Sequence, residues 1–336
     1  MARRVSIKDV AQRAGVSWKT VSNVVNDRPV VRPETRARVE AAIAELGYVP
    51  NHVGRDLRGG PTRTLALVLP ELQNPYFARL AELMQVAARA RGYAVSVEVS
   101  LGSAEVERAH VRGLVPRPVD AVIISPAALA PADLEAGIGP RVVLLGEMLP
   151  ASKQVSHVAI DNIASATDVV RHLVDLGRRR ILFLGVDGAL RSTATDRLAG
   201  YRAALRFADL PADPDLIRTV GSWHREAGRS ETEAALEAGI AFDAVVAGND
   251  LLAVGAMAAL HARGLRVPED VAVAGWDDIP EAAWSRPGLT TIAPDLDALI
   301  AAALDAALAE ADDSSAGGAE TVVGHQLLVR GSSVPA

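Results

Sequence analysis

From Thr64 onward, the chain alternates between short apolar runs and longer amphipathic segments, and it does so twice. The run TLALVLP, which begins at Thr64, is continuously apolar, as strands are when both faces of a parallel sheet are covered. The segment NPYFARLAELMQVAARARGY, which begins at Asn74, has the periodicity of an amphipathic helix. After about residue 160 the alternation starts again, with a helix in DNIASATDVVRHLVDLG and a strand in RRILFLG. This repetition predicts two parallel sheets with helices on both faces, and therefore a two-lobed α/β domain.

Three short helices are predicted ahead of this α/β domain. Ser6 is a good N-cap for the first helix, and Gly15 allows the chain to turn before the second helix, which Ser17 caps. Pro33 suits the first turn of the third helix, which Gly47 ends. Two short helices joined by a glycine turn form a helix-turn-helix, whose second helix enters the major groove of DNA. The predicted fold class is a small all-α helix-turn-helix head followed by a two-lobed α/β domain.

The second helix of this head presents a polar face, and the head is basic. Trp18, Lys19, Ser22, Asn23 and Asn26 lie on that face, and these residue types contact base edges and phosphates. Residues 1–60 carry a net charge of +5, whereas the rest of the chain carries −11. A basic head on an acidic body is typical of a protein whose head binds a polyanion. The alternative is a generic helical subdomain with a polar face.

Side chains that follow the predicted strands are candidates for a ligand site, because ligands bind at the carboxyl ends of parallel strands. Carboxylate, amide and arginine groups hydrogen-bond hydroxyl pairs, and aromatic rings cover the C–H faces of a sugar. A sugar or related metabolite therefore fits these residue types. The alternatives are that Asp161 and Asn249 cap helices and that Tyr76 and Phe77 are core residues. The candidates are Asn74, Tyr76, Phe77, Ser125, Asp161, Arg197, Trp223, Asn249 and Asp277.

Motifs of common catalytic sites are absent from the sequence. No G-x-G-x-x-G follows the first predicted strand, no lysine follows a glycine as in a P-loop, and neither G-x-S-x-G nor H-E-x-x-H occurs. We therefore expect neither catalysis nor a metal or other cofactor. The sequence has no cysteine, no run of about 18 apolar residues and no apolar segment after its basic start. These features predict a cytoplasmic protein without disulfides.

The motifs DVAQRAGVS, TVSNVVN, ETRARV and LGYVPN follow one another without gaps in the head. Together they resemble the DNA-binding head of the LacI family of bacterial repressors. A departure is Arg32, where that family usually has a capping serine before the third helix. The residues that the resemblance places at DNA are Ser6, Ile7, Ser17, Trp18, Lys19, Ser22, Asn23 and Asn26 for bases or phosphates, and Thr20, Thr35, Tyr48 and Asn51 for phosphates.

The stretch PNHVGRDLRGG, residues 50–60, resembles the hinge helix of the same family. That helix forms on the operator and lies in the minor groove, where Leu57 would insert between base pairs and kink the duplex. Asn51, His52 and Arg55 would face phosphate or groove. Gly54 stands where the family usually has alanine, and this costs about 1 kcal/mol of helix propensity. Our hypothesis is that Gly54 makes this hinge fold less readily than the hinges of its relatives.

The segments AIDNIASA and GLRVPEDVAVAGWDD resemble the body of LacI-family proteins, which in turn is similar to periplasmic sugar-binding proteins. Pro294 stands where the family often has a polar residue, so a ligand hydrogen bond is not expected there. The positions that match family effector residues are Asp161, Thr193, Arg197, Trp223, Asn249 and Asp277.

The expected organisation is a DNA-binding domain at residues 1–50, a hinge helix and linker at 51–63, and an effector-binding and dimerisation domain at 64–336. The first lobe covers about residues 64–160 and the second about 161–290. The chain crosses between the lobes again near residues 290–325, and its last strand lies in TVVGHQLLVRGSS.

The predicted function is sequence-specific repression of sugar-utilisation genes. A homodimer would bind a palindromic operator, and a sugar-like effector would release it. The alternative is a sugar-binding receptor or an enzyme built on the same two-lobed fold. The sequence leaves open whether the effector induces or co-represses.

Overall fold

The computed structural model describes residues 5–25, 29–46, 48, 62–135, 139–146, 155–186, 192–309 and 318–334. It consists of two compact units, Met1–Thr62 and Arg63–Ala336. The predicted DNA-binding residues Asn26, Asn51, His52, Arg55 and Leu57 lie outside the described residues.

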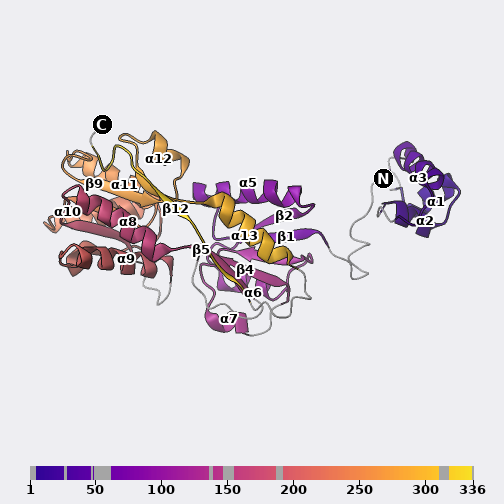
Figure 1. Ribbon diagram of the computed structural model, residues 1–336, viewed down its shortest axis with the longest axis horizontal. Coiled ribbons are helices and arrows are strands. Elements are labelled where there is room, and N and C mark those ends of the chain that lie inside the picture. Colours follow the sequence, from indigo (N-terminus) through magenta and orange to yellow (C-terminus); the bar gives the residue numbers. More distant parts are fainter. Residues whose placement is uncertain are drawn as a thin grey trace. The chain divides into compact units, whose positions relative to one another are not determined.

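The described residues of the first unit, called the head below, form three helices around one small core (Figure 1). Ser6 caps the first helix in a reciprocal capping box with Asp9, whose Oδ2 accepts a hydrogen bond from the Ser6 amide at 2.8 Å. Gly15 ends that helix with φ 64°, a left-handed conformation that glycine adopts without strain. Val10, Val21 and other apolar side chains from all three helices form the core. The helices are α1 (Ile7–Ala14), α2 (Trp18–Val25) and α3 (Pro33–Leu46).

The first lobe of the second unit is a parallel sheet in the order β11-β5-β4-β3-β1-β2. The run Leu65–Leu69 is buried on both faces of this sheet, as its unbroken apolar character predicted. Helices α5 and α13 cover one face, and α6 and α7 cover the other. The elements are β1 (Thr64–Leu69), α5 (Pro75–Ala90), β2 (Ala94–Val99), α6 (Ala104–Val111), β3 (Ala121–Ile124), α7 (Pro131–Glu135), β4 (Arg141–Leu145), β5 (Val155–Ile160), α13 (Leu296–Leu308) and β11 (Glu320–Val323).

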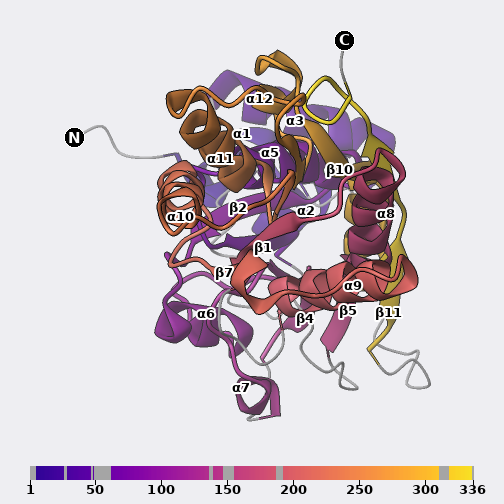
Figure 2. The same cartoon turned by 90° about the vertical axis from the view of Figure 1, so that its left-hand side faces the viewer.

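The second lobe has a sheet in the order β12-β10-β9-β8-β6-β7, in which only the β10–β12 pairing of the described strands is antiparallel. Helices α8 and α9 pack on one face, and α10 and α11 pack on the other. Figure 2 shows α8 and α11 on opposite sides of β10. The elements are α8 (Asn162–Asp175), β6 (Ile181–Val186), α9 (Thr193–Phe207), the 3₁₀ turn Pro214–Leu216, β7 (Ile217–Thr219), α10 (Arg225–Glu237), β8 (Ala244–Ala247), α11 (Asp250–Ala262), β9 (Ala272–Trp276), α12 (Pro280–Trp284), β10 (Thr290–Pro294) and β12 (His325–Leu328).

The chain crosses between the lobes three times. It leaves β5 at Ile160 for α8, leaves β10 at Pro294 for α13, and passes from β11 to β12 at Gly324. The segment TVVGHQLLVRGSS, predicted as one last strand, is therefore two strands in two different sheets. The predicted fold class, a helical head and a two-lobed α/β domain, is confirmed. The first two crossings bring residues of both lobes to the carboxyl ends of the strands. Among the described helices, none combines the length and apolar character needed to cross a membrane.

Candidate effector pocket and DNA-binding face

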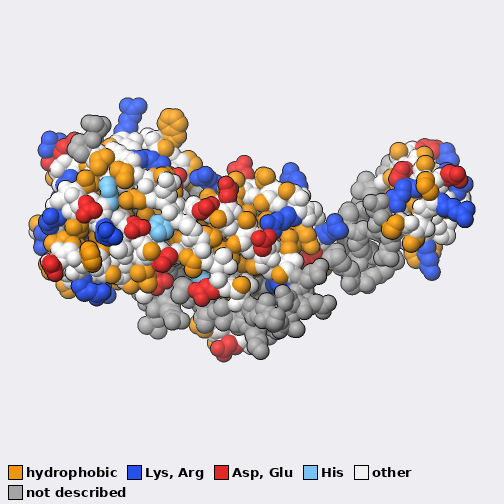
Figure 3. All heavy atoms as spheres, in the orientation of Figure 1, with side chains coloured by type: hydrophobic (Ala, Val, Ile, Leu, Met, Phe, Trp, Pro, Cys, Tyr) orange, Lys and Arg blue, Asp and Glu red, His pale blue; other side chains and the backbone are white. Residues whose placement is uncertain are grey.

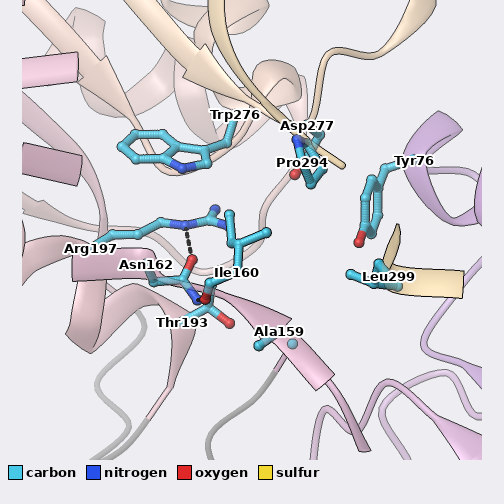
Figure 4. A pocket seen from close by; sticks show the side chains of 11 residues that line it. Tyr76, Ala159, Ile160, Asn162, Thr193, Arg197, Trp276, Asp277, Pro294 and Leu299 are labelled. Atoms are coloured by element: carbon cyan, nitrogen blue, oxygen red, sulfur yellow. Dashed lines mark hydrogen bonds between the residues drawn. The ribbon is translucent and has the colours of Figure 1, made fainter. Parts of the chain in front are cut away.

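A pocket lies between the two lobes (Figure 4). It opens at the carboxyl ends of the strands, the place where parallel α/β sheets bind ligands. Both lobes and the first two crossings contribute to its walls. The lining residues are Tyr76, Gly146, Ala159, Ile160, Asn162, Thr193, Arg197, Trp276, Asp277, Pro294 and Leu299.

Arg197 is the central cation of the pocket and is held on several sides. Its Nε donates to Asn162 Oδ1 at 2.9 Å, and one terminal nitrogen donates to the Gly248 carbonyl. The guanidinium carbon lies 4.9 Å from the centroid of the Trp276 ring and 5.9 Å from that of Trp223. These contacts fix the plane of the guanidinium, and a fixed plane suits in-plane hydrogen bonding to a hydroxyl pair.

Asn162 and Trp276 are pocket residues that the sequence reasoning missed. The Asn162 side-chain amide donates to the Ile160 carbonyl at 3.4 Å, which orients its Oδ1 toward Arg197. Trp276 is fully buried and donates from Nε1 to Ser165 Oγ at 3.3 Å. Their position in the sequence could have indicated them, because each is adjacent to a predicted residue: Asn162 follows Asp161, and Trp276 precedes Asp277.

Asp277 enters the pocket from a strained turn after β9. Its φ is 103° and that of Asp278 is 50°, both in the region that side-chain-bearing residues rarely adopt. The fully buried Asp250 supports this turn, because its Oδ2 accepts from the Ile279 amide at 2.9 Å and its Oδ1 from Thr291 Oγ1 at 2.6 Å. Burial raises the pKa of Asp277 to about 6, and the positive charge of Arg197 acts in the opposite direction.

Effector binding is expected to weaken as the pH falls below about 6, because effector hydroxyls that donate to Asp277 favour its ionised form. The loss should approach about tenfold per pH unit. The Asp277 carboxyl has a higher pKa in the folded chain than in the unfolded chain. Its ionisation therefore lowers the free energy of unfolding as the pH rises from 3.8 to about 6. Isothermal titration calorimetry between pH 5 and 8 measures the affinity. Asp277→Asn cannot titrate and should flatten the profile, and an equally flat wild-type profile would contradict the assignment.

Tyr76 forms the opposite wall of the pocket from the first turn of α5. Its ring packs edge-on against Phe77, with ring centroids 5.2 Å apart. Burial, with a smaller contribution from the charge of Asp277, raises the pKa of the Tyr76 phenol. The phenol therefore stays protonated at neutral pH and can donate one hydrogen bond.

Four of the ten predicted effector residues, Tyr76, Thr193, Arg197 and Asp277, line this pocket. Three others cap helices: Asn74 Oδ1 accepts from the Tyr76 amide at 3.0 Å, Asp161 Oδ1 from Ala164 at 2.8 Å, and Asn249 Oδ1 from Leu252 at 2.9 Å. The Asn249 amide nitrogen also donates to the Trp223 carbonyl, so both ends of this side chain are used within the protein.

Phe77, Ser125 and Trp223 are also outside the pocket lining. Phe77 packs against the core of the first lobe, and Trp223 packs against the core of the second. The Ser125 amide continues the sheet by donating to the Val68 carbonyl at 3.0 Å. Contact of these three residues with an effector, like that of the three capping residues, remains a prediction.

Residues 17–19, at the start of α2 and of its predicted DNA-binding face, are exposed. Ser17 caps the helix, since its Oγ accepts from the Thr20 amide at 3.2 Å and lies 2.9 Å from Thr20 Oγ1. Trp18 is 41% exposed, and Lys19 lies beside it with Nζ 6.0 Å from the indole centroid. Figure 3 shows Lys and Arg side chains on the surface of the head. The remaining described candidates are half-buried, namely Ser6, Ile7, Ser22, Asn23, Thr35 and Tyr48.

A helix-turn-helix head ahead of a two-lobed domain with a polar pocket defines the class of ligand-responsive DNA-binding regulators. Residues 6–51 match the model for bacterial regulatory proteins of the lacI family, and residues 170–333 match the periplasmic binding protein-like domain. The chain is 36% identical to the HTH-type transcriptional regulator AscG of Escherichia coli (strain K12), covering 84% of this chain and 85% of AscG. It is 31% identical to GalR of the same strain, covering 92% and 90% of the two chains.

Solved structures of other proteins match the fold of this chain over almost its whole length. The lac repressor dimer bound to operator and the anti-inducer ONPF matches with a TM-score of 0.86 at 29% identity, covering 99% of this chain and 100% of that chain. The CelR–cellobiose complex matches with a TM-score of 0.69 at 31% identity, covering 98% and 100%. The chain belongs to the LacI family of bacterial transcriptional regulators. The family expected from the head motifs is thereby confirmed.

Proposed function

We propose that this regulator is a repressor whose affinity for DNA is set by a sugar or sugar derivative bound between the two lobes. The observation that carries the proposal is the fixed Arg197, which shares the pocket with Asp277 and with the indole of Trp276. A guanidinium and a carboxylate bind hydroxyl pairs, and an aromatic wall favours the C–H faces of a sugar ring. The CelR–cellobiose complex supports the same ligand class.

On the DNA side, a homodimer would place one head on each half of a near-palindromic operator, because two-fold protein symmetry matches two-fold DNA symmetry. The lac repressor structure, a dimer bound to operator, supports this arrangement. The exposed start of α2, with Ser17, Trp18 and Lys19, would read the major groove. We propose no catalytic role, and a protein that acts on the chromosome would work in the cytoplasm.

The effector can control DNA affinity only if it binds two arrangements of the lobes unequally. Two of the crossings lie at the pocket, at Ile160 and Pro294, so a ligand there touches the segments that connect the lobes. A thermal shift screen of sugars and nucleosides, repeated in an operator gel shift, tests the proposal. A ligand that raises the melting temperature and changes operator affinity is the expected result. If no ligand changed operator affinity, effector control would be excluded.

Lys19→Ala is expected to relax sequence preference at one operator position. Lys19 is exposed at the start of α2, where a recognition helix contacts base edges. The loss should be about 1–3 kcal/mol at that position and small elsewhere. Gel shifts with single-base operator variants measure it, and Lys8→Ala on α1 serves as a control for the loss of one positive charge. A uniform loss across all sequences would assign Lys19 to a phosphate instead.

A further inference from the structure

We propose that Glu71 and His224 form a latch that joins the two lobes and favours the lobe arrangement described above. Glu71 lies between β1 and α5 of the first lobe, and His224 lies between β7 and α10 of the second. His224 Nε2 lies 3.0 Å from Glu71 Oε2, so the ring can donate a hydrogen bond to the carboxylate, and protonation of the ring makes the contact an ion pair. The inference deepens the proposed function, and its consequence for the effector rests on that function.

The order of the strands places this contact away from the crossings. The strands of the three crossings, β5 and β11 in the first sheet and β10 and β12 in the second, lie at one edge of each sheet. Glu71 follows β1, three strand positions from β5, and His224 follows β7, four from β10. Neighbouring strands are about 4.8 Å apart, so the contact is well removed from the crossings. Figure 2 shows β7 and α10 on the side opposite β10 and β11.

A rotation of one lobe about the crossings therefore displaces this contact more than it displaces the crossings themselves. A side-chain hydrogen bond is lost once its two heavy atoms are about 3.6 Å apart, so a small opening breaks it. Each partner moves with its own lobe, because α10 packs closely on α11 at Gly228, and Asn74 caps α5 just after Glu71. The contact thus belongs to this arrangement of the lobes and is lost in a more open one.

The His224 side chain is directed to the other lobe instead of to its own helix. His224 is the N-cap of α10, a position where Ser, Thr, Asp or Asn usually bonds the first turn, yet its side chain makes no capping hydrogen bond to the described residues of that helix. The side chains of His224 and Glu71 are 35% and 24% exposed. A partly exposed pair shifts an equilibrium by about two- to fivefold, which is small for the stability of a lobe. The same factor acts directly on the ratio of two lobe arrangements, which an effector has to shift.

Neighbouring contacts between the lobes limit what the latch does. Tyr76 packs against the cores of both lobes, and Arg79 Nη1 donates to the Asp278 carbonyl at 3.5 Å. These contacts do not depend on the latch, so its loss should change the ratio of the two arrangements without separating the lobes. An effector that binds the latched arrangement gains affinity by the same factor.

The test measures the distance between the lobes of the full-length chain without effector. The chain has no cysteine, so Arg89→Cys on α5 and Ser230→Cys on α10, both exposed positions, direct one spin label to each lobe. Labelled chain is mixed with an excess of unlabelled chain, so that pulsed electron paramagnetic resonance measures distances within one chain. Glu71→Ala or His224→Ala should raise the ratio of longer to shorter distances about two- to fivefold. The double variant should match either single variant, because each removes the same contact.

Arg218→Ala is the matched control. Arg218 pairs with Glu231 at 3.1 Å inside the second lobe, with similar exposure, so its loss should leave the distances unchanged. Wild-type distances in both single variants, or additive effects in the double variant, would overturn the latch and leave the proposed sugar site intact. Conversely, failure of every sugar in the screen would overturn the proposed function without changing these distances, because they are measured without effector.

Discussion

Arg197→Ala is expected to lower effector affinity at least about 100-fold, which corresponds to about 2.7 kcal/mol. Arg197 is 7% exposed and is the one arginine among the described lining residues, so no other described lining residue can replace its charge. A hydrogen bond from a charged group contributes about 1.5–3 kcal/mol, and a bound hydroxyl pair would lose such a partner. Isothermal titration calorimetry with the effector found in the screen measures the change.

The same substitution is also expected to change the stability of the protein in the absence of effector. Without Arg197, the Asn162 Oδ1 and the Gly248 carbonyl lose a buried donor, and Asp277 loses the positive charge that opposes the rise of its pKa. The pKa of Asp277 should therefore rise further, and the melting temperature should fall.

The controls separate binding from stability. Arg202→Ala removes an exposed arginine from the same helix and should change neither the effector affinity nor the melting temperature. Arg197→Lys keeps the charge but loses the planar fork, so it should recover the fold and only part of the affinity. If Arg197→Ala bound the effector with wild-type affinity, the assignment of Arg197 to the effector site would be wrong.

The fold could be predicted from the sequence because most of its strands, helices and turns have a recognisable local sequence pattern. The apolar run of β1 is buried on both faces, and the glycine turn at Gly15 has the left-handed backbone that its position suggested. The short strand β7 and the division of the last strand at Gly324 had no such signal, because both depend on which neighbouring strand the chain meets.

The predicted effector residues follow strands of the two sheets, but not all of their side chains are among the residues that line the pocket. Asp161 and Asn162 are adjacent, and the start of α8 turns the first to the Ala164 amide and the second to Arg197. The sequence could not distinguish them, because the choice depends on where the helix begins to within one residue. The same holds for Trp276, whose neighbour Asp277 was predicted, since the strained turn after β9 decides which side chains face the pocket.

Gly255→Ala is expected to destabilise the second lobe by about 3 kcal/mol, although alanine is the better helix former by about 1 kcal/mol. Gly255 of α11 and Gly228 of α10 allow these two helices to pack backbone to backbone. A Cβ at Gly255 would overlap the Arg225 carbonyl, and one at Gly228 would overlap the Leu252 carbonyl. Neither helix can move away easily, because both also pack on the buried core that contains Leu252 and Ala256.

Urea denaturation of the full-length chain measures the loss, and Gly221→Ala is the matched control because its added Cβ would meet nothing within 4 Å. Gly221→Ala should keep the wild-type midpoint, while Gly255→Ala lowers it. A double variant with Gly228→Ala should lose less than the sum of the single changes, because once one overlap has separated the helices, the second Cβ meets a wider gap. A wild-type midpoint for Gly255→Ala would show that α10 and α11 do not pack this closely. An additive double variant would show that the two glycines act independently.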